Sequence, residues 1–226
     1  MMKGKTVLRK INRGIVLGVI LLIGLVIFLV IDDQNFQRQQ PEIQRMVEQY
    51  LQDVSEISIF PEQYQKIGEE VPVQVVEEKK KEVGDVLNRY WVRQTGTVNY
   101  QNWESISLEW NSMIDQNSKG NGYISDWSGL PMGSVKITKT GPGAAKAVFP
   151  YSIVVEVHGI ADSNTLTGCL YTNQGISPDQ ASEEEKQKVQ KYSVSGEFQV
   201  DMIQMNGSWK FAEGYYSSVS SAAPVE

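Results

Sequence analysis

The most pronounced hydrophobic feature of the chain is an unbroken apolar segment, residues 14–31, which contains no charged or polar side chain. A basic head with five Lys and Arg residues precedes it in residues 1–13, and Asp32 and Asp33 follow it. At the helical rise of 1.5 Å per residue the segment spans roughly 27 Å, which is close to the thickness of a hydrocarbon core. The pattern therefore predicts one transmembrane helix behind a short basic head.

The flanking charges predict the orientation of this helix. Basic residues stay preferentially on the cytoplasmic side, so we expect a cytoplasmic N-terminus and an extracytoplasmic 32–226. A cleaved signal peptide is the alternative, but its apolar core has only about 7–15 residues and ends at a small-x-small site. This segment ends in Leu-Val-Ile-Asp-Asp, without such a site. We expect an uncleaved membrane anchor, whose apolar surface includes Gly14, Ile15, Leu17, Leu21, Leu25, Phe28 and Ile31.

Helical spacing of apolar residues resumes after a polar stretch, 34–40. Pro41 suits the first position of a helix. The apolar positions that follow recur at intervals of three and four: Ile43, Met46, Val47, Tyr50, Leu51 and Val54. We expect an amphipathic helix that ends near Ser55, and we treat 32–72 as a linker and stalk helix. Either the anchor helix continues into it with a break, or it is a separate helix that docks on the domain.

Two further helices are predicted before the pattern changes. The first covers about 73–94, with apolar residues on one side and a stop at Gly96. The second covers 102–116; Ile106, Leu108 and Trp110 would also suit a strand, but the wider spacing favours a helix. Glycine, asparagine and proline then mark 117–133 as loops.

From Val135 onward the period is two, which indicates β-strands. The longest alternation covers 145–157 and places one apolar face inward and one largely polar face outward, with a bend or bulge expected near Pro150. A short strand is expected at 166–171. Residues 172–190 are strongly polar and predict an exposed insertion, either helical or a mobile loop. Ser177 within it has the features of a helix start.

The C-terminal part carries the clearest local signal. Alternating residues from Val194 lead to Asn206-Gly207, a strong two-residue hairpin turn, and the chain returns through Trp209. We expect 217–226 to be a flexible tail and 73–216 to form one α+β domain. In this fold class the helices pack on one face of a curved, cone-like antiparallel sheet.

Charge and cysteine content narrow the classes of partner. All 27 acidic residues lie beyond the basic head, against 16 basic ones, so the exterior part has a net charge of −11. An acidic surface does not favour nucleic acid or anionic lipid headgroups, so we expect no nucleic-acid partner. The single cysteine, Cys169, allows no disulfide within the chain, which suits a bacterial cell surface.

The sequence contains no catalytic signature, and we expect no catalytic residue, cofactor or metal site. His158, the only histidine, lies two residues after Glu156 on the wetter face of its strand, so a base and its orienting carboxylate are conceivable there. Cys169 has no nucleophile motif around it. The tryptophans are expected mainly in the core; Trp91, Trp127 and Trp209 are the candidate partner or ligand contacts. Trp127, in a glycine-rich loop, is the main candidate for an exposed anchor that binds a partner or a glycan.

One resemblance follows from the helix end Val-Leu-Asn-Arg-Tyr-Trp at 86–91, the turn Thr95-Gly96 and the terminal hairpin 198–211. These segments resemble the nuclear-transport-factor-2-like superfamily. With one N-terminal anchor, the whole is similar to the single-pass assembly subunits of type IV secretion and conjugation machines. That resemblance implies a non-catalytic scaffold in a bacterial cell membrane, whose partners are other envelope proteins or further copies of itself. The alternatives are a ligand-binding or sensory ectodomain with a cone pocket, and a membrane-tethered enzyme that uses His158.

Overall fold

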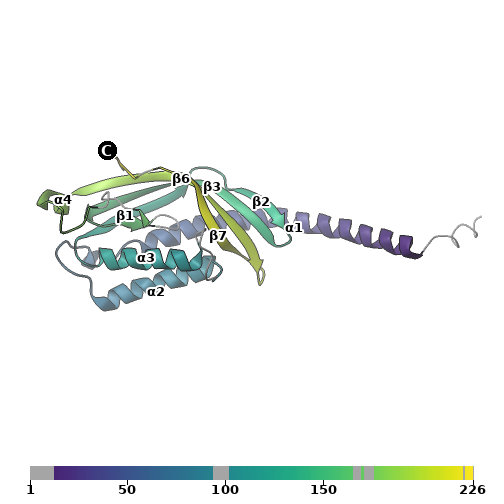
Figure 1. The fold of residues 1–226 in the computed structure, drawn as a ribbon, viewed down its shortest axis with the longest axis horizontal. Helices are drawn as coiled ribbons and strands as arrows, with labels where there is room; N and C mark the ends of the chain where they lie inside the picture. Colours follow the sequence, from purple (N-terminus) through teal and green to yellow (C-terminus); the bar gives the residue numbers. More distant parts are fainter. Residues whose placement is uncertain (1–12, 94–101, 165–168, 171–175, 221, 226) are drawn as a thin grey trace, which may run out of the picture. The chain divides into compact units, whose positions relative to one another are not determined.

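The computed structural model describes residues 13–93, 102–164, 169–170, 176–220 and 222–225. It divides into two compact units, Met1–Pro41 and Glu42–Glu226. The predicted short strand near 166–171 and the predicted stop at Gly96 lie partly or wholly outside the described residues. The fold is α+β, as the sequence predicts: helices come first and an antiparallel sheet follows (Figure 1).

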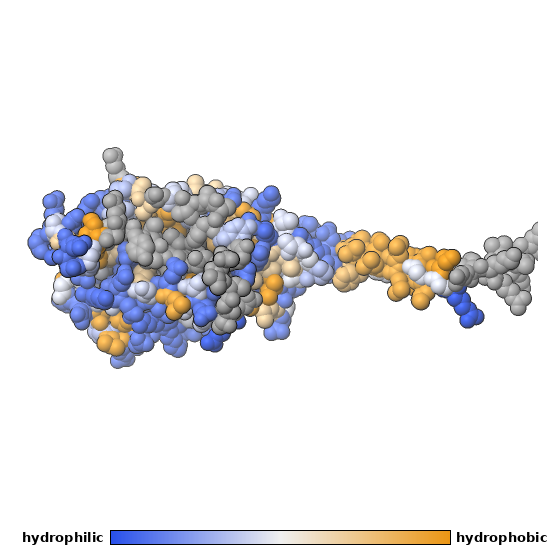
Figure 2. All heavy atoms as spheres, viewed as in Figure 1, coloured by the Kyte–Doolittle hydropathy of each residue, from blue (hydrophilic) through white to orange (hydrophobic). Residues whose placement is uncertain are grey.

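The described part of the first unit is helical. Helix α1 (Arg13–Ile57) contains the apolar segment 14–31. The side chains of this segment are exposed, for example Leu21 and Phe28. Figure 2 shows this stretch as a continuous apolar surface. By length and composition it is a helix that can cross a membrane, and none of its most apolar window is buried by the protein. The exposure of so many apolar side chains is consistent with lipid as their surroundings.

The polar stretch 34–40 is helical as well. Of the two arrangements that the sequence allowed, the structure therefore has the one in which the apolar helix continues into the next helix. Pro41 lies inside α1, and not at the first position of a new helix. The second compact unit begins at Glu42. Its part of α1 buries the predicted apolar stripe almost completely: Ile43, Val47, Tyr50, Leu51 and Val54. This stripe makes α1 part of the core of the second unit.

The next two helices begin where the periodicity predicts them, but the first ends at Tyr90 and does not reach the predicted end near 94. Helix α2 (Val73–Tyr90) follows Pro72 and buries residues at helical spacing, including Val83 and Leu87. Helix α3 (Trp103–Asn117) begins at Asn102, whose side chain accepts hydrogen bonds from two backbone N–H groups of the first turn. Such a cap satisfies donors that have no partner within the helix. The two helices lie side by side along one face of the sheet (Figure 1).

The main sheet has the strand order β1-β3-β6-β7, and every pairing in it is antiparallel. These strands are β1 (Gly122–Pro131), β3 (Ala144–Gly159), β6 (Val189–Met205) and β7 (Ser208–Val219). Strand β2 (Lys136–Gly141) also pairs with β3, and β8 (Ala223–Val225) pairs with β6. Short elements complete the fold: the 3-10 turn η2 (Glu62–Tyr64), β4 (Ser163–Asn164), β5 (Cys169–Leu170) and α4 (Glu183–Gln187).

The long strand β3 provides the centre of the core. Its residues alternate strictly between buried and half-buried, as the period-two pattern predicts. Phe149 on β3 packs edge to face against Phe198 on β6, with ring centroids 5.6 Å apart. The hairpin between β6 and β7 forms at Asn206 and Gly207, which have φ angles of 51° and 83°. Positive φ at both central residues is the geometry that favours an Asn-Gly turn.

Pro150 causes no bulge in the β3–β6 pairing, although the sequence-based expectation placed a bend or bulge near it. The β3–β6 register continues through it without a shift. Pro150 lies between the last β1 pair, Pro131 with Tyr151, and the first β2 pair, Lys136 with Val148. Its carbonyl accepts the N–H of Met132, so its nitrogen also faces this gap, where no ladder hydrogen bond requires a donor. Register shifts occur elsewhere in the sheet: in β1 between Ile124 and Asp126, and also in the β2–β3 and β6–β7 pairings.

The structure differs from three of the sequence-based predictions for loop and tail segments. Residues 122–131 form β1 and not a loop. The helix in the polar insertion begins after Ser182, whose side chain makes a capping box with Glu185, and not at Ser177. The chain after 217 continues in β7 and then in β8, so part of the expected tail is paired with the sheet. In each case pairing or capping with a distant or later residue decides the conformation.

Candidate binding sites

The three tryptophans expected as contacts are buried. Trp91, Trp127 and Trp209 are only 2–3% exposed. Trp91 packs against Phe211 with ring centroids 5.1 Å apart, and Tyr50 of α1 packs against the same phenylalanine at 5.3 Å. The expectation that Trp127 is an exposed loop residue is wrong, because it lies on β1 and faces the core. These indoles stabilise the domain and present little surface to a partner.

The Glu156–His158 pair has further partners that the sequence did not reveal, among them Lys191 on β6, whose Nζ lies 3.4 Å from Glu156 Oε2. Strand β1 places Tyr123 opposite His158, and the two rings stack with centroids 4.5 Å apart. The hydroxyl of Ser125 donates to Glu156 Oε1 at 2.7 Å, and His158 Nε2 lies 2.9 Å from the same hydroxyl oxygen. Because 122–131 reads as a loop in the sequence, its pairing with β3 was not predicted.

This cluster is a closed hydrogen-bond network. In a Ser–His–carboxylate triad the hydroxyl and the carboxylate must bind opposite nitrogens of the imidazole. Here both Ser125 and Glu156 lie at Nε2, while Nδ1 is 3.1 Å from the hydroxyl of Tyr123. The Ser125 hydrogen bond is the main reason that the pKa of Glu156 is lowered. The lowered pKa makes this carboxylate a weaker base toward the hydroxyl of Ser125.

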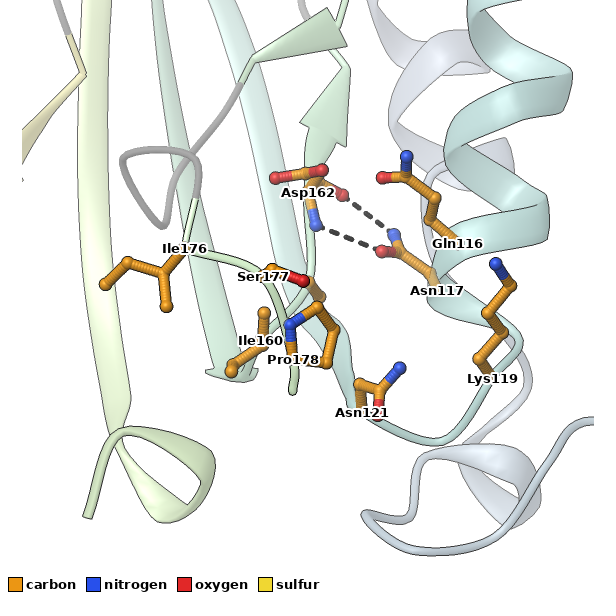
Figure 3. A pocket seen from close by; sticks show the side chains of 10 residues that line it. Gln116, Asn117, Lys119, Asn121, Ile160, Asp162, Ile176, Ser177 and Pro178 are labelled. Atoms are coloured by element: carbon orange, nitrogen blue, oxygen red, sulfur yellow. Dashed lines mark hydrogen bonds between the residues drawn. The ribbon is translucent and has the colours of Figure 1, made fainter. Parts of the chain in front are cut away.

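A small polar pocket lies where α3 ends beside the segment that follows β3 (Figure 3). Its volume is about 280 Å³. The buried side chain of Asn117 donates to the backbone carbonyl of Asp162 at 2.7 Å and accepts the backbone N–H of Asp162 at 3.0 Å. This amide pair fixes the segment to the helix. The other lining residues include Gln116, Lys119 and Asn121.

The carboxyl group of Asp162 is the unusual titratable group of this pocket. Its pKa is raised to about 6 because burial disfavours the charged form. A carboxylate desolvated in this way is an attractive site for a cationic or hydrogen-bond-donating group. The sequence contained no signal for it, because nothing in the local pattern around Asp162 indicates burial.

A larger groove, with a volume of about 560 Å³, separates α1 of the second unit from β1. One wall carries Glu48, Gln52 and Ser55, which recur at helical spacing on α1. The other wall is the end of β1, including Gly129 and Leu130. Buried Leu51 and Trp127 contribute its apolar lining. The groove therefore combines an apolar floor with a polar helix on one side and a strand on the other.

Metal ligation has no clear basis in this geometry. Among the described residues, no three His, Cys, Asp or Glu side chains lie close enough together to hold a metal ion. Cys169 lies on β5, and His158 lies on β3. Concave surfaces of the domain include the small, mostly polar pocket at Asp162 and the larger, partly apolar groove between α1 and β1.

Comparison with known proteins gives structural likenesses only. No model of a known protein family and no curated protein sequence matches the chain. A nuclear transport factor 2 (NTF2-like) superfamily protein from Salmonella enterica is similar over 80% of this chain and 92% of its own, with 10% identity and a TM-score of 0.46. A hexachlorocyclohexane dehydrochlorinase (LinA) type 2 is similar over 86% of this chain and 93% of its own, with 10% identity and a TM-score of 0.41.

A third similar structure is an IcmL-like type IV secretion system protein from Legionella pneumophila. It covers 79% of this chain and 93% of its own, with 12% identity and a TM-score of 0.29. The families that the sequence resembles are thus represented among the structural neighbours. The neighbours include an enzyme as well as a secretion protein, and likenesses of this size assign no activity to this chain.

Proposed function

We propose that this chain is a single-pass protein of a bacterial cell membrane, with its N-terminus in the cytoplasm and its α+β domain outside. The domain acts as a non-catalytic scaffold that binds other envelope proteins in a conjugation- or secretion-like machine. The observation that carries the proposal is the uncharged, fully exposed apolar stretch of α1 immediately before a compact domain. The sequence resemblance supports the choice of machine.

The chemistry of the domain supports a binding role over a catalytic one. A general base needs a substrate proton within hydrogen-bond reach and a suitable pKa. The only histidine has both ring nitrogens engaged by Tyr123, Ser125 and Glu156. The acidic balance of the chain disfavours nucleic acid as a partner. The remaining concave surfaces are suited to peptides or small polar groups.

The orientation is tested by protease protection in intact spheroplasts of cells that carry one epitope tag at the N-terminus and another at the C-terminus. Because the basic head precedes the span, we expect external protease to remove the C-terminal tag and to spare the N-terminal one. Protection of the C-terminal tag would refute the orientation. Release of a shorter soluble product that carries only the C-terminal tag would instead indicate a cleaved leader.

The scaffold role is tested by purifying the tagged full-length protein from its own cells in mild detergent after crosslinking, with mass spectrometry as the readout. We expect several envelope proteins to co-purify and to disappear when residues 42–226 are deleted. Recovery of the protein alone would overturn the scaffold role. The His158→Ala variant is the control for the enzymatic alternative, and we expect it to retain the same partners.

The second candidate function is a ligand-binding ectodomain, and the pocket at Asp162 favours it. Its lining is polar, so a ligand there would carry hydrogen-bond donors or a cation, and would not stack on tryptophan as the sequence suggested. A thermal-shift screen of small amines separates the two functions. A shift that Asp162→Asn abolishes would support ligand binding.

A further inference from the structure

The end of β1 is a strand edge that lies across a groove from helix α1. In the described sheet β1 is the terminal strand and pairs only with β3. Its side toward α1 borders the 560 Å³ groove, which both elements line. An edge strand that faces a helix across a groove is the geometry in which proteins add an extended peptide to a sheet.

The hydrogen-bond register shows which backbone groups face that groove. The N–H of Met132 donates to the carbonyl of Pro150, so the backbone N–H and C=O of Met132 point toward β3. Backbone groups alternate in direction along a strand, so the N–H and C=O of Leu130, which lies opposite Ser152, also point toward β3. The N–H and C=O of Gly129, between them, therefore face away from β3 and toward the groove that Gly129 lines.

Gly129 also has a steric role in shaping this surface. A Cβ atom at this position would lie 2.7 Å from Cη2 of Trp127, so only glycine leaves room for the indole. Trp127 can therefore lie over the strand end as part of the groove lining. Leu130, which is 68% exposed, adds an apolar rim. Side chains of an added strand would contact this rim and this floor.

The charge of the groove indicates the chemistry of its occupant. Of the ten residues that line it, Glu48 alone is charged. Residues 42–226 contain 25 acidic and 15 basic residues, a net charge of −10, so a second copy of the domain would be repelled. A complementary partner carries Lys or Arg.

We propose that the groove between α1 and β1 binds an extended, basic peptide segment of a partner protein, which pairs with the β1 edge at Gly129 and places a Lys or Arg against Glu48. The inference rests on the proposed scaffold function and names the surface through which it acts. Backbone pairing supplies general affinity, and the apolar floor and Glu48 supply selectivity.

The test uses the full chain in nanodiscs, panned against a library of random displayed peptides. We expect the enriched peptides to contain Lys or Arg together with β-branched residues. Their affinity for Glu48→Lys should be weaker by about tenfold or more, because attraction becomes repulsion. Glu78→Lys is the matched control: Glu78 on α2 is exposed and accepts a hydrogen bond from Gln74, as Glu48 does from Gln44. Its peptide affinity should stay within about twofold of the parent chain.

Two further measurements locate the peptide and its mode of binding. An N-methylated copy of an enriched peptide cannot donate backbone hydrogen bonds, so it should lose binding if the peptide adds to the strand. A benzoylphenylalanine in place of Leu130 should crosslink to the peptide, whereas the same group in place of Leu108, a comparably exposed leucine on α3, should not.

The outcomes separate this inference from the scaffold function. No enriched peptide, equal loss in both Lys variants, or undiminished binding of the N-methylated peptide would overturn the groove proposal. If partners still co-purify with Glu48→Lys from cells but are lost with the domain, the scaffold stands and this groove is not its surface. If no partner co-purifies with the parent chain, the scaffold function itself fails.

Discussion

Replacing Asp162 with asparagine should stabilise this protein at neutral pH, although the change alters a pocket residue. Burial raises the pKa of the Asp162 carboxyl from 3.8 to about 6. The ionised form is therefore less favourable in the folded chain than in the unfolded chain. The Asn117 amide binds only backbone atoms of residue 162, so Asp162→Asn leaves both of those hydrogen bonds in place.

The magnitude follows from the difference between the two pKa values. Each unit corresponds to about 1.4 kcal/mol, so a difference of about 2 units sets an upper limit near 3 kcal/mol. Solvent reaches part of the side chain, and screening reduces the value to about 1–2 kcal/mol. For a chain of this size the variant should melt about 2–8 °C higher at pH 7.5.

The sign depends on pH in a defined way. Below the unfolded pKa of 3.8 the carboxyl is neutral in both states, so the stabilising neutral form is fully present. As the pH rises from about 4 through 6, the unfolded chain loses its proton first and the parent protein loses stability. The gain from Asp162→Asn should therefore be absent near pH 4 and complete above about pH 7.

The assay is thermal unfolding of the full-length protein in detergent, followed by tryptophan fluorescence at several pH values. Asp115→Asn is the control of opposite sign, because it removes an ion pair of 2.8 Å with Lys80 and should lower stability by at most about 1 kcal/mol. A lower melting temperature for Asp162→Asn at pH 7.5 would refute the reasoning. It would mean that a cation or donor already compensates the carboxylate.

Two further predictions concern packing and a buried contact between helices. Gly214→Ala would place a Cβ atom on the buried ring of Phe198 and should destabilise the domain by about 1–3 kcal/mol in denaturant titrations. The control Gly84→Ala, in a helix with open space around it, should instead stabilise by up to about 1 kcal/mol, and equal losses in both would contradict this account. Tyr90→Phe removes the 2.8 Å hydrogen bond to Asp53 that joins α2 to α1, and should cost about 1–2 kcal/mol by the same measurement. In the parent protein the pKa of Tyr90 is raised to about 12, chiefly by burial. Absorbance during alkaline titration should therefore contain a late-ionising tyrosine that the Tyr90→Phe variant lacks, and identical late titrations would count against this contact.

Local patterns were sufficient for the elements that bury one face over many residues. The local pattern predicts which side chains are buried or exposed in the uncharged 14–31 segment, in the helical stripes of α2 and α3, and in the alternation of β3. The Asn206-Gly207 turn is equally local, since it needs positive φ at both positions and these two residue types adopt it readily. For these segments the physical cause and the sequence signal lie within one element.

The sites depended on contacts that no local pattern contains. Strand β1 was read as a loop because its glycines and proline resemble turns and its bulge after Ile124 breaks the alternation. Only pairing with β3, more than 20 residues away, makes it a strand and brings Ser125 to Glu156. Trp127 is buried for the same reason.

The sequence by itself determined the apolar helix, the α+β class and the balance of charge, because each is a property of composition or of short-range period. The tertiary structure alone decided that Asp162 is desolvated, that the Glu156–His158 pair is enclosed in a network, and that Glu48 faces the end of β1 across a groove. These features arise from the register between distant segments, and register is set by the packing of the whole sheet against its helices.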